Sequence, residues 1–241
     1  YHFQQFNPLG RVVHLQPMHW KDGWPVIGVD MDMNGIGEPV ESWRKPNVGK
    51  HTQIVTPAAS DNFNGEKLGL QWQFNHNPVN EAWSLTTQKG KLTFHAIKAD
   101  NFRNARNTLT QKTIGYTGEA TVKMEWNNKE MADGQRCGIV CMGRQNWTLG
   151  IMQEEGKRYI YLEKDNQIIR QEPYKGNAVY LRMNANATDN AYQLLYSTDA
   201  KMFTAPDNSF PMHFGNWKGV RIGLYCYNTN ENAGKVCFDD F

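Results

Sequence analysis

Residues 119–126, EATVKMEW, alternate strictly between apolar and polar side chains. The apolar positions run from Ala120 to Trp126 in steps of two, and the positions between them are polar or charged. Successive side chains of a β-strand point to opposite faces of its sheet, so this period of two is typical of an antiparallel strand with one buried face. The stretch predicts a strand whose apolar face covers a hydrophobic core.

Strand-like segments of the same kind follow at intervals of roughly ten residues, each bounded by Gly, Asn or Asp. They are residues 136–143, 147–154, 158–164, 167–172, 178–185, 191–198 and 220–227. Helical periodicity is almost absent from the chain. Short strands at this spacing are typical of an all-β sandwich or barrel, and we expect a β-sandwich from residue 60 to residue 241.

The N-terminal part of the chain shows fewer strand-like segments and a less regular pattern. Two strand-like segments, 11–18 and 23–30, are joined at Asp22-Gly23, a strong hairpin signal. Residues 46–59 contain two prolines and little pattern, so we interpret them as a linker. The chain starts in mid-strand without a targeting signal, and we expect further sequence, including any leader, to lie upstream.

Charge and composition exclude some classes of function. The 26 basic and 24 acidic residues give a net charge of +2 without a cluster of positive charge, which argues against a nucleic-acid surface. No apolar stretch reaches membrane-spanning length. The eight Trp residues suit stacking on sugar rings, although large core aromatics explain such a number equally well.

The four cysteines show no CxxC pair and no histidine-rich spacing, which argues against a zinc site. Cys137 and Cys141 share one strand face, too far apart along the strand to bond each other. Cys226 and Cys237 flank a loop, which makes them candidates for cross-strand neighbours. We expect buried free thiols rather than disulfides.

The acidic residues lie mostly at turns or on predicted solvent faces, and no catalytic pair of carboxylates or Ser-His-Asp arrangement is evident. One loop fits the calcium-binding pattern of an EF-hand, with Asp30, Asp32, Asn34, Gly35 and Glu41 at the ligand and turn positions. The loop follows a strand-like segment, and prolines interrupt it and any helix after it. We therefore favour a glycine-rich hairpin tip over a metal site.

Arg11 is placed unusually for a charged residue. It shares a predicted strand face with Val13 and Leu15, whereas His14 faces the other way. An unpaired buried guanidinium is costly, so Arg11 needs a partner. One interpretation is an arginine at the rim that reaches water. The other is an arginine in a cleft wall that holds ligand hydroxyls or a carboxylate.

Several motifs, in this order along the chain, resemble glycoside hydrolase family 43. They are GRVVHLQPMHWKDGWPVIGVD (10–30), GEPV (37–40), SDNFNGEKLGLQWQFNHNP (60–78), WSLT (83–86), GKLTF (90–94) and ARNTLTQKTIG (105–115). The resemblance is to the β-xylosidase and α-L-arabinofuranosidase group, whose members have a C-terminal concanavalin-A-like sandwich. It extends over nearly the whole chain.

The resemblance implies that residues 1–45 are the last blade of a five-bladed β-propeller. Residues 60–241 would then be a concanavalin-A-like antiparallel β-sandwich (jelly roll). In this family the two catalytic Asp residues and the Glu acid come from earlier blades, so this chain carries none of the catalytic residues. The implied reaction is inverting hydrolysis that removes xylose or arabinose from xylo-oligosaccharides or arabinoxylan.

The resemblance also implies roles for particular residues. Arg11 matches an arginine that contacts the sugar in the innermost subsite. His2 matches a histidine near the propeller axis that binds a hydrated calcium or orients a carboxylate. Trp217 is the candidate, by position, for an aromatic side chain over the active-site mouth. The family pattern has Phe there, so a core tryptophan is an equal alternative. Asp61 and Asp239 are candidate ligands of a structural calcium, although Asp61 as a turn cap is favoured.

Three hypotheses of function follow. The first is the C-terminal part of a periplasmic or secreted glycosidase, whose missing propeller blades complete the site. The second is a non-catalytic carbohydrate-binding module, which requires a solvent-facing row of aromatics among Trp72, Trp83, Trp147 and Trp217. The third is a structural sandwich that stabilises the propeller and a homo-oligomer. The choice between xylosidase and arabinofuranosidase depends on upstream residues.

Overall fold

A computed structural model describes the chain except residues 1, 7, 214 and 216 and the side chain of His2. The described residues form two compact units. The first comprises residues 2–6 and 11–56, and the second comprises residues 8–10 and 57–241. The division after Thr56 lies inside the predicted linker, whereas the grouping of residues 8–10 with the sandwich was not expected.

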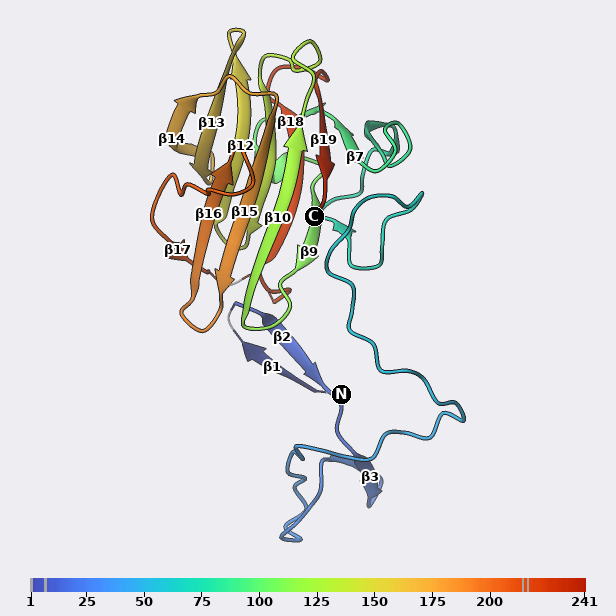
Figure 1. Cartoon of the computed structure of the whole chain (residues 1–241). Coiled ribbons are helices and arrows are strands. Elements are labelled where there is room, and N and C mark those ends of the chain that lie inside the picture. Colours follow the sequence, from blue (N-terminus) through green and yellow to red (C-terminus); the bar gives the residue numbers. More distant parts are fainter. Residues whose placement is uncertain (1, 7, 214, 216) are drawn as a thin grey trace. The chain divides into compact units, whose positions relative to one another are not determined.

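The second unit is a sandwich of two sheets that lie face to face (Figure 1). The described strands of its first sheet are, in spatial order, β17 (Phe210–Pro211), β16 (Ala191–Ser197), β15 (Ala178–Asn186), β10 (Thr117–Glu125), β19 (Lys235–Asp239), β7 (Leu92–His95) and β6 (Trp83–Ser84). Those of its second sheet are β14 (Gln167–Pro173), β13 (Lys157–Lys164), β12 (Asn146–Glu154), β11 (Gln135–Met142), β18 (Arg221–Asn228), β9 (Leu109–Lys112) and β5 (Gln73–Phe74). A short strand, β8 (Ile97–Lys98), pairs parallel with β18, and the other described pairs are antiparallel. The prediction of an all-β, antiparallel sandwich is confirmed.

Strand β10 has the predicted alternation. Val122 and Met124 are buried between the sheets, and the charged side chains of Lys123 and Glu125 lie on the opposite face. Val122 pairs with Leu181 of β15, which is itself buried, so the register places apolar side chains of both strands on the same face. This register keeps the charged faces of both strands away from the core.

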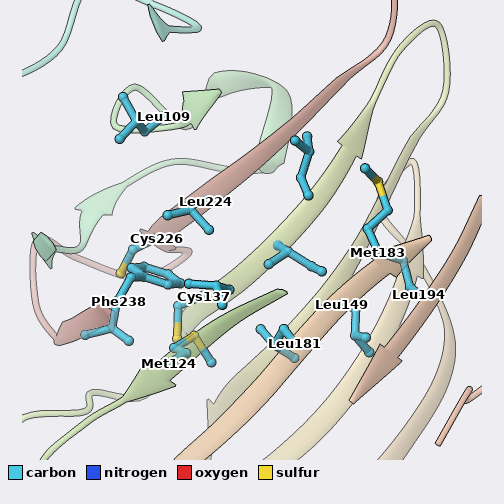
Figure 2. Close-up of a cluster of buried hydrophobic side chains, with 14 of the residues drawn as sticks. Leu109, Met124, Cys137, Leu149, Leu181, Met183, Leu194, Leu224, Cys226 and Phe238 are labelled. Carbon is cyan, nitrogen blue, oxygen red and sulfur yellow. The ribbon is translucent and has the colours of Figure 1, made fainter. Parts of the chain in front are cut away.

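The core between the sheets is built from both layers (Figure 2). Leu181 and Phe238 come from the first sheet, and Leu149 and Leu224 come from the second. These side chains are fully buried. Burial of each such side chain stabilises the fold by about 1.5–3 kcal/mol, so this interlayer core is the main source of stability.

A second apolar cluster covers the outer face of the second sheet. Tyr161 of β13 and Tyr225 and Tyr227 of β18 project from this face and pack with Phe102. Phe102 belongs to a short 3-10 helix, η2 (Phe102–Asn104), and its ring meets that of Tyr225 edge to face at 5.5 Å. Strands of this sheet are therefore buried on both faces, and period-two alternation is lost there.

The cysteines lie in the sandwich as buried free thiols, as predicted. The expected neighbours Cys226 and Cys237 are on different sheets, so that prediction is wrong. The cross-strand neighbour of Cys226 on β18 is Cys137 on β11, and the Gln135 side chain contacts both sulfurs. Burial raises the pKa values of the Cys137 and Cys141 thiols, which keeps both protonated.

The first unit contains two strand pairs, β1 (His2–Phe6) with β2 (Gly10–His14), and β3 (Met18–Lys21) with β4 (Trp24–Ile27) in antiparallel orientation. The Asp22-Gly23 hairpin is confirmed, with φ of 51° and 82° at its two central residues.

The predicted strand 11–18 is interrupted after His14. The amide side chain of Gln16 pairs there with both backbone polar groups of Val40, which draws residue 16 out of strand pairing.

The described part of the chain contains no helix with the length and hydropathy of a membrane span.

Candidate functional site

Arg11 lies on β2 with its guanidinium over the ring of Phe3 on β1, 4.4 Å from the ring centroid. This cation–π contact fixes the planar group beside an aromatic face. Val13, on the same face of β2, is 65% exposed, and Leu15, just beyond the end of the strand, is 57% exposed. The two apolar residues predicted beside Arg11 are therefore exposed, and the Phe3 ring supplies an apolar contact for the guanidinium.

The prediction for His2 lies outside the described residues, because the structure describes only the backbone of that residue. Its role near a propeller axis stays a prediction. Arg11 belongs to the first unit, whereas Trp217 belongs to the second.

The turn before Arg11 is docked on the sandwich. The backbone N–H of Val220 donates to the carbonyl of Pro8 at 2.9 Å. Leu9 packs against the interlayer core and lines a hollow of about 450 Å³ at the end of the sandwich, together with Met183 and Phe241. The position of the chain just before Arg11 is thus set by contacts with the sandwich.

Glycines allow this close approach. A Cβ atom on Gly10 would lie 2.3 Å from the backbone nitrogen of Gly219, and one on Gly219 would lie 2.5 Å from the carbonyl oxygen of Leu9. Both glycines also have positive φ, 83° and 80°. Only residues without a side chain fit both the space and the backbone conformation.

Trp217 lies in the same sandwich turn and is 58% exposed. Its backbone has a φ of 65°, unusual for a bulky residue, and its carbonyl oxygen faces Gly10. An exposed indole at a left-handed turn position is not a core residue, so the alternative of a core tryptophan does not hold.

The other tryptophans considered for carbohydrate binding are packed within the sandwich. Trp72 is buried and donates from Nε1 to Asp61 at 2.8 Å. Trp83 packs against the core beside Phe74. Trp147 stacks on Phe210 with ring centroids 4.1 Å apart. Together with Trp217 they do not form the solvent-facing row that a binding module requires.

The two predicted calcium ligands of the sandwich have different surroundings. Asp61 accepts hydrogen bonds from the Phe63 backbone and from Trp72, so both of its oxygens are used. The backbone of Asp61 pairs with Phe241, which brings the first and last segments together as expected. No third His, Cys, Asp or Glu among the described residues joins Asp61 and Asp239 in a ligand cluster. A calcium ion between them stays a prediction.

The EF-hand-like loop forms a tip between Val29 and Glu38, whose backbones make an isolated bridge. The favoured hairpin tip is thus observed. The tip also gathers carboxylates, since Asp30, Asp32 and Glu38 each place an oxygen within 4.8 Å of the others. Glu41, the expected last ligand, is not part of this cluster.

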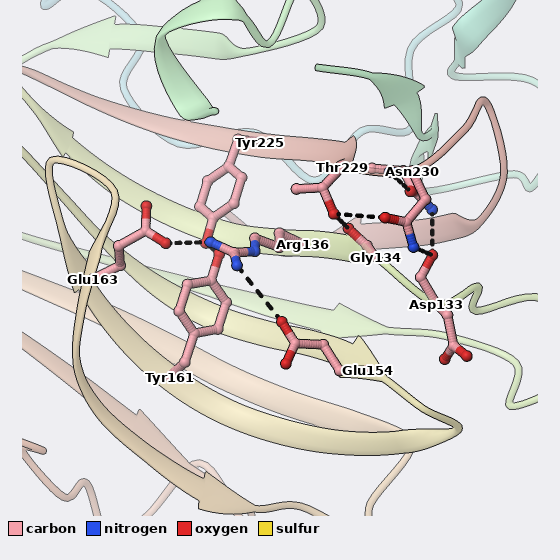
Figure 3. A network of polar contacts seen from close by, with 10 residues as sticks. Asp133, Gly134, Arg136, Glu154, Tyr161, Glu163, Tyr225, Thr229 and Asn230 are labelled. Atoms are coloured by element: carbon pink, nitrogen blue, oxygen red, sulfur yellow. Dashed lines mark hydrogen bonds and ion pairs between the residues drawn. The ribbon is translucent and has the colours of Figure 1, made fainter. Parts of the chain in front are cut away.

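Reasoning from the sequence missed a polar network on the outer face of the second sheet (Figure 3). Arg136 of β11 pairs with Glu163 of β13 at 2.5 Å and with Glu154 of β12 at 3.6 Å. The hydroxyls of Tyr161 and Tyr225 are 2.6 Å apart. Glu163 is buried, because the tyrosine cluster covers this face.

The electrostatics of this network are those of a structural element. Burial raises the pKa of Glu163, against the lowering effect of Arg136. Burial likewise raises the pKa values of Tyr161 and Tyr225, so both phenols stay protonated and hydrogen-bonded. The groups are paired with one another, so we assign the network to holding β11, β12, β13 and β18 together.

Residues 60–241 match the family model described as the β-xylosidase C-terminal concanavalin A-like domain. The chain belongs to this family. This match places the chain among the glycoside hydrolase family 43 proteins, as the sequence motifs indicated. The concanavalin A-like description agrees with the two facing antiparallel sheets.

Individual relatives agree with this assignment. A protein of Xylanibacter ruminicola named as a candidate β-xylosidase is 39% identical over 98% of this chain and 43% of its own length. A β-xylosidase of Formosa agariphila is 35% identical over 96% of the chain and 42% of its own length. The solved structure of a bifunctional GH43-CE protein of Bacteroides eggerthii has a TM-score of 0.80 and 31% identity, covering 99% of this chain and 31% of that one. The chain spans less than half the length of these relatives.

Proposed function

We propose that this chain is the C-terminal part of a glycoside hydrolase that removes terminal xylose or arabinose from hemicellulose. One observation carries the proposal. A relative named as a candidate β-xylosidase matches 98% of the chain, including the segment before the sandwich, at 39% identity. A relative from Bacteroides ovatus, 26% identical over 98% of the chain, is named a non-reducing-end α-L-arabinofuranosidase, which keeps both sugars in the proposal.

The reaction we propose is inverting hydrolysis. One carboxylate activates water on one side of the sugar, and a carboxylic acid protonates the leaving oxygen on the other. These carboxylates would come from propeller blades encoded upstream of residue 1. The share of the relatives that this chain spans, 43% and 42%, leaves room for such blades.

The exposed apolar side chains of the first unit support this arrangement. Val13, Trp20 and Trp24 are large and exposed, and they lie on the short strands β2, β3 and β4. Trp20 and Trp24 lie on paired strands, and exposed apolar groups of this size mark a surface that another segment covers. We propose that the upstream blades of the same protein cover them.

Within this arrangement Arg11 would contact the sugar. Its guanidinium offers several N–H donors in a rigid plane, which suits a pair of adjacent hydroxyls. Phe3 packs on one face of that plane and orients the guanidinium.

Two experiments test the proposal. The first is to read the sequence upstream of residue 1, which we expect to carry two Asp residues and one Glu on separate blades. The second is to assay the longer protein on 4-nitrophenyl β-D-xylopyranoside and α-L-arabinofuranoside, and to follow the anomer released by NMR. Release of the inverted sugar is expected, and a retained anomer or no hydrolysis of either substrate would contradict the proposal.

The role of Arg11 has a matched control. Arg11→Lys keeps the charge but loses the planar fork, and we expect about a 100-fold lower kcat/KM. Arg170→Lys on the exposed edge strand β14 makes the same chemical change away from the proposed site. Equal activity of the two variants would remove Arg11 from the substrate pocket while leaving the hydrolase assignment to the other tests.

A further inference from the structure

The tip after β4 holds a group of charges that the proposed hydrolase reaction does not use. Asp30, Asp32 and Glu38 bring three carboxylates together. Among the described residues, Lys21 pairs with this group: its Nζ lies 3.6 Å from Asp30 Oδ2, and its side chain is 46% exposed. Three carboxylates beside one partly solvated ammonium leave an excess of negative charge.

The decisive observation concerns Asp30. Its side chain is only 10% exposed, and its Oδ1 atom is buried without a hydrogen-bond partner among the described residues. Its other oxygen accepts from the backbone N–H of Gly35 at 2.9 Å. A buried carboxylate oxygen without a donor or a cation is costly, so this atom is placed as if for a ligand.

Donor chemistry and spacing identify the ligand class. Carboxylate and amide oxygens are the ligands of hard divalent cations, and Asp, Asp and Asn at alternate positions followed by Gly are typical of calcium loops. Asp30, Asp32 and Asn34 have this spacing, with Gly35 at a φ of 89° where the turn needs it. The side chains of Met31 and Met33 between them are exposed to solvent.

We propose that this tip is a calcium site in which Asp30, Asp32 and Glu38 supply carboxylate oxygens. Ca²⁺ would occupy the position facing Asp30 Oδ1 and would displace the Lys21 ammonium. Glu38 takes the place of Glu41, the last ligand of the EF-hand pattern, because the Val29–Glu38 bridge draws the chain back at that point. The bound ion would tie β4 to the segment that leads into the linker.

This inference does not depend on the hydrolase reaction and can be tested on the 241-residue chain itself. The chain is freed of metal and titrated with CaCl₂, and separately with MgCl₂, by calorimetry. We expect one Ca²⁺ per chain with a Kd of about 0.1–1 mM, as in extracellular calcium modules, and weaker binding of Mg²⁺. The thermal midpoint of the first unit should rise with Ca²⁺.

Variants locate the site. Asp32→Asn is chosen because Asp32 is exposed and its side chain accepts hydrogen bonds from Asn34 alone among the described residues, so its loss should not unfold the chain. We expect binding at least about tenfold weaker, and Lys21→Met should strengthen it severalfold. Glu66→Gln removes an exposed carboxylate elsewhere and Asp61→Asn tests the sandwich, and both should bind like the parent.

Three outcomes would overturn the proposal. One is no binding heat with the parent chain at about 10 mM Ca²⁺, well above the expected range. The second is unchanged affinity in Asp32→Asn when circular dichroism shows that it is folded. The third is loss of binding in Asp61→Asn alone, which would place the ion in the sandwich.

Discussion

Gly10 and Gly219 approach so closely that a Cβ atom on the first would lie 2.3 Å from the backbone nitrogen of the second. Gly219 in turn faces the carbonyl oxygen of Leu9 at a distance that no side chain tolerates. This contact joins the turn before Arg11 to the sandwich turn that carries Trp217. Its tightness makes it a sensitive point of the second unit.

Gly219→Ala should therefore destabilise the chain by more than the cost of placing alanine at a positive φ. Alanine at positive φ costs about 1 kcal/mol, and the clash with Leu9 adds to it, so we expect a loss of about 3 kcal/mol. Gly156→Ala is the matched control, since Gly156 has a φ of 72° and no atom near its Cβ position. Urea unfolding gives the free energy of unfolding of both variants. Equal losses in the two would show that the close approach of Gly219 to Leu9 does not contribute to stability.

The pairing of Arg136 with two carboxylates allows a second comparison. Glu163 is buried, with a side chain 2% exposed, whereas that of Glu154 is 49% exposed. Removing the buried partner leaves the guanidinium poorly compensated, so Glu163→Gln should lower the free energy of unfolding by about 2 kcal/mol. Glu154→Gln should cost about 0.5 kcal/mol or less. The reverse order in urea unfolding would contradict this assignment.

Glu125 gives a prediction of pH dependence. Its burial opposes ionisation, but hydrogen bonds from Lys91 and Lys123 outweigh that effect and lower its pKa. A carboxyl whose pKa is lower in the folded state stabilises the fold above its unfolded pKa of 4.5, and this contribution is lost as the pH falls through the folded value.

Glu125→Gln should accordingly cost about 1 kcal/mol near pH 7 and almost nothing near pH 3. Glu119→Gln on the same strand is the control, because Glu119 is exposed in its pair with Arg182 and should show little change at either pH. Urea unfolding at both pH values gives the difference. A cost for Glu125→Gln that does not shrink in acid would rule out the ion pair as its cause.

The sequence predicted best what depends on local pattern. Val122 and Met124 alternate with charged neighbours, and Asp22-Gly23 can adopt the positive φ that a tight hairpin needs, so both features could be read without knowledge of the fold. The approximate residue ranges of the sandwich strands could be read from the turn residues that separate them.

Contacts between strands distant in sequence could not be predicted from local pattern. Cys137 lies beside Cys226 because β18 pairs with β11 although many strands separate them along the chain. Glu163 is buried because Phe102 and its neighbours cover an outer face that alternation marks as solvated. In the tip after β4, Glu38 replaces Glu41 because a backbone bridge, invisible to ligand spacing, decides which carboxylate reaches the cluster.

Trp217 provides a test that joins the sandwich to the proposed hydrolase activity. Its indole is 58% exposed, so Trp217→Ala should leave the free energy of unfolding nearly unchanged. If the side chain covers the substrate in the longer protein, kcat/KM on 4-nitrophenyl glycosides should fall about tenfold, and Trp217→Phe should restore most of it. Met202→Ala removes another exposed apolar side chain of the sandwich and should have no effect. Unaltered kinetics in Trp217→Ala would mean that the sandwich acts only as a structural support.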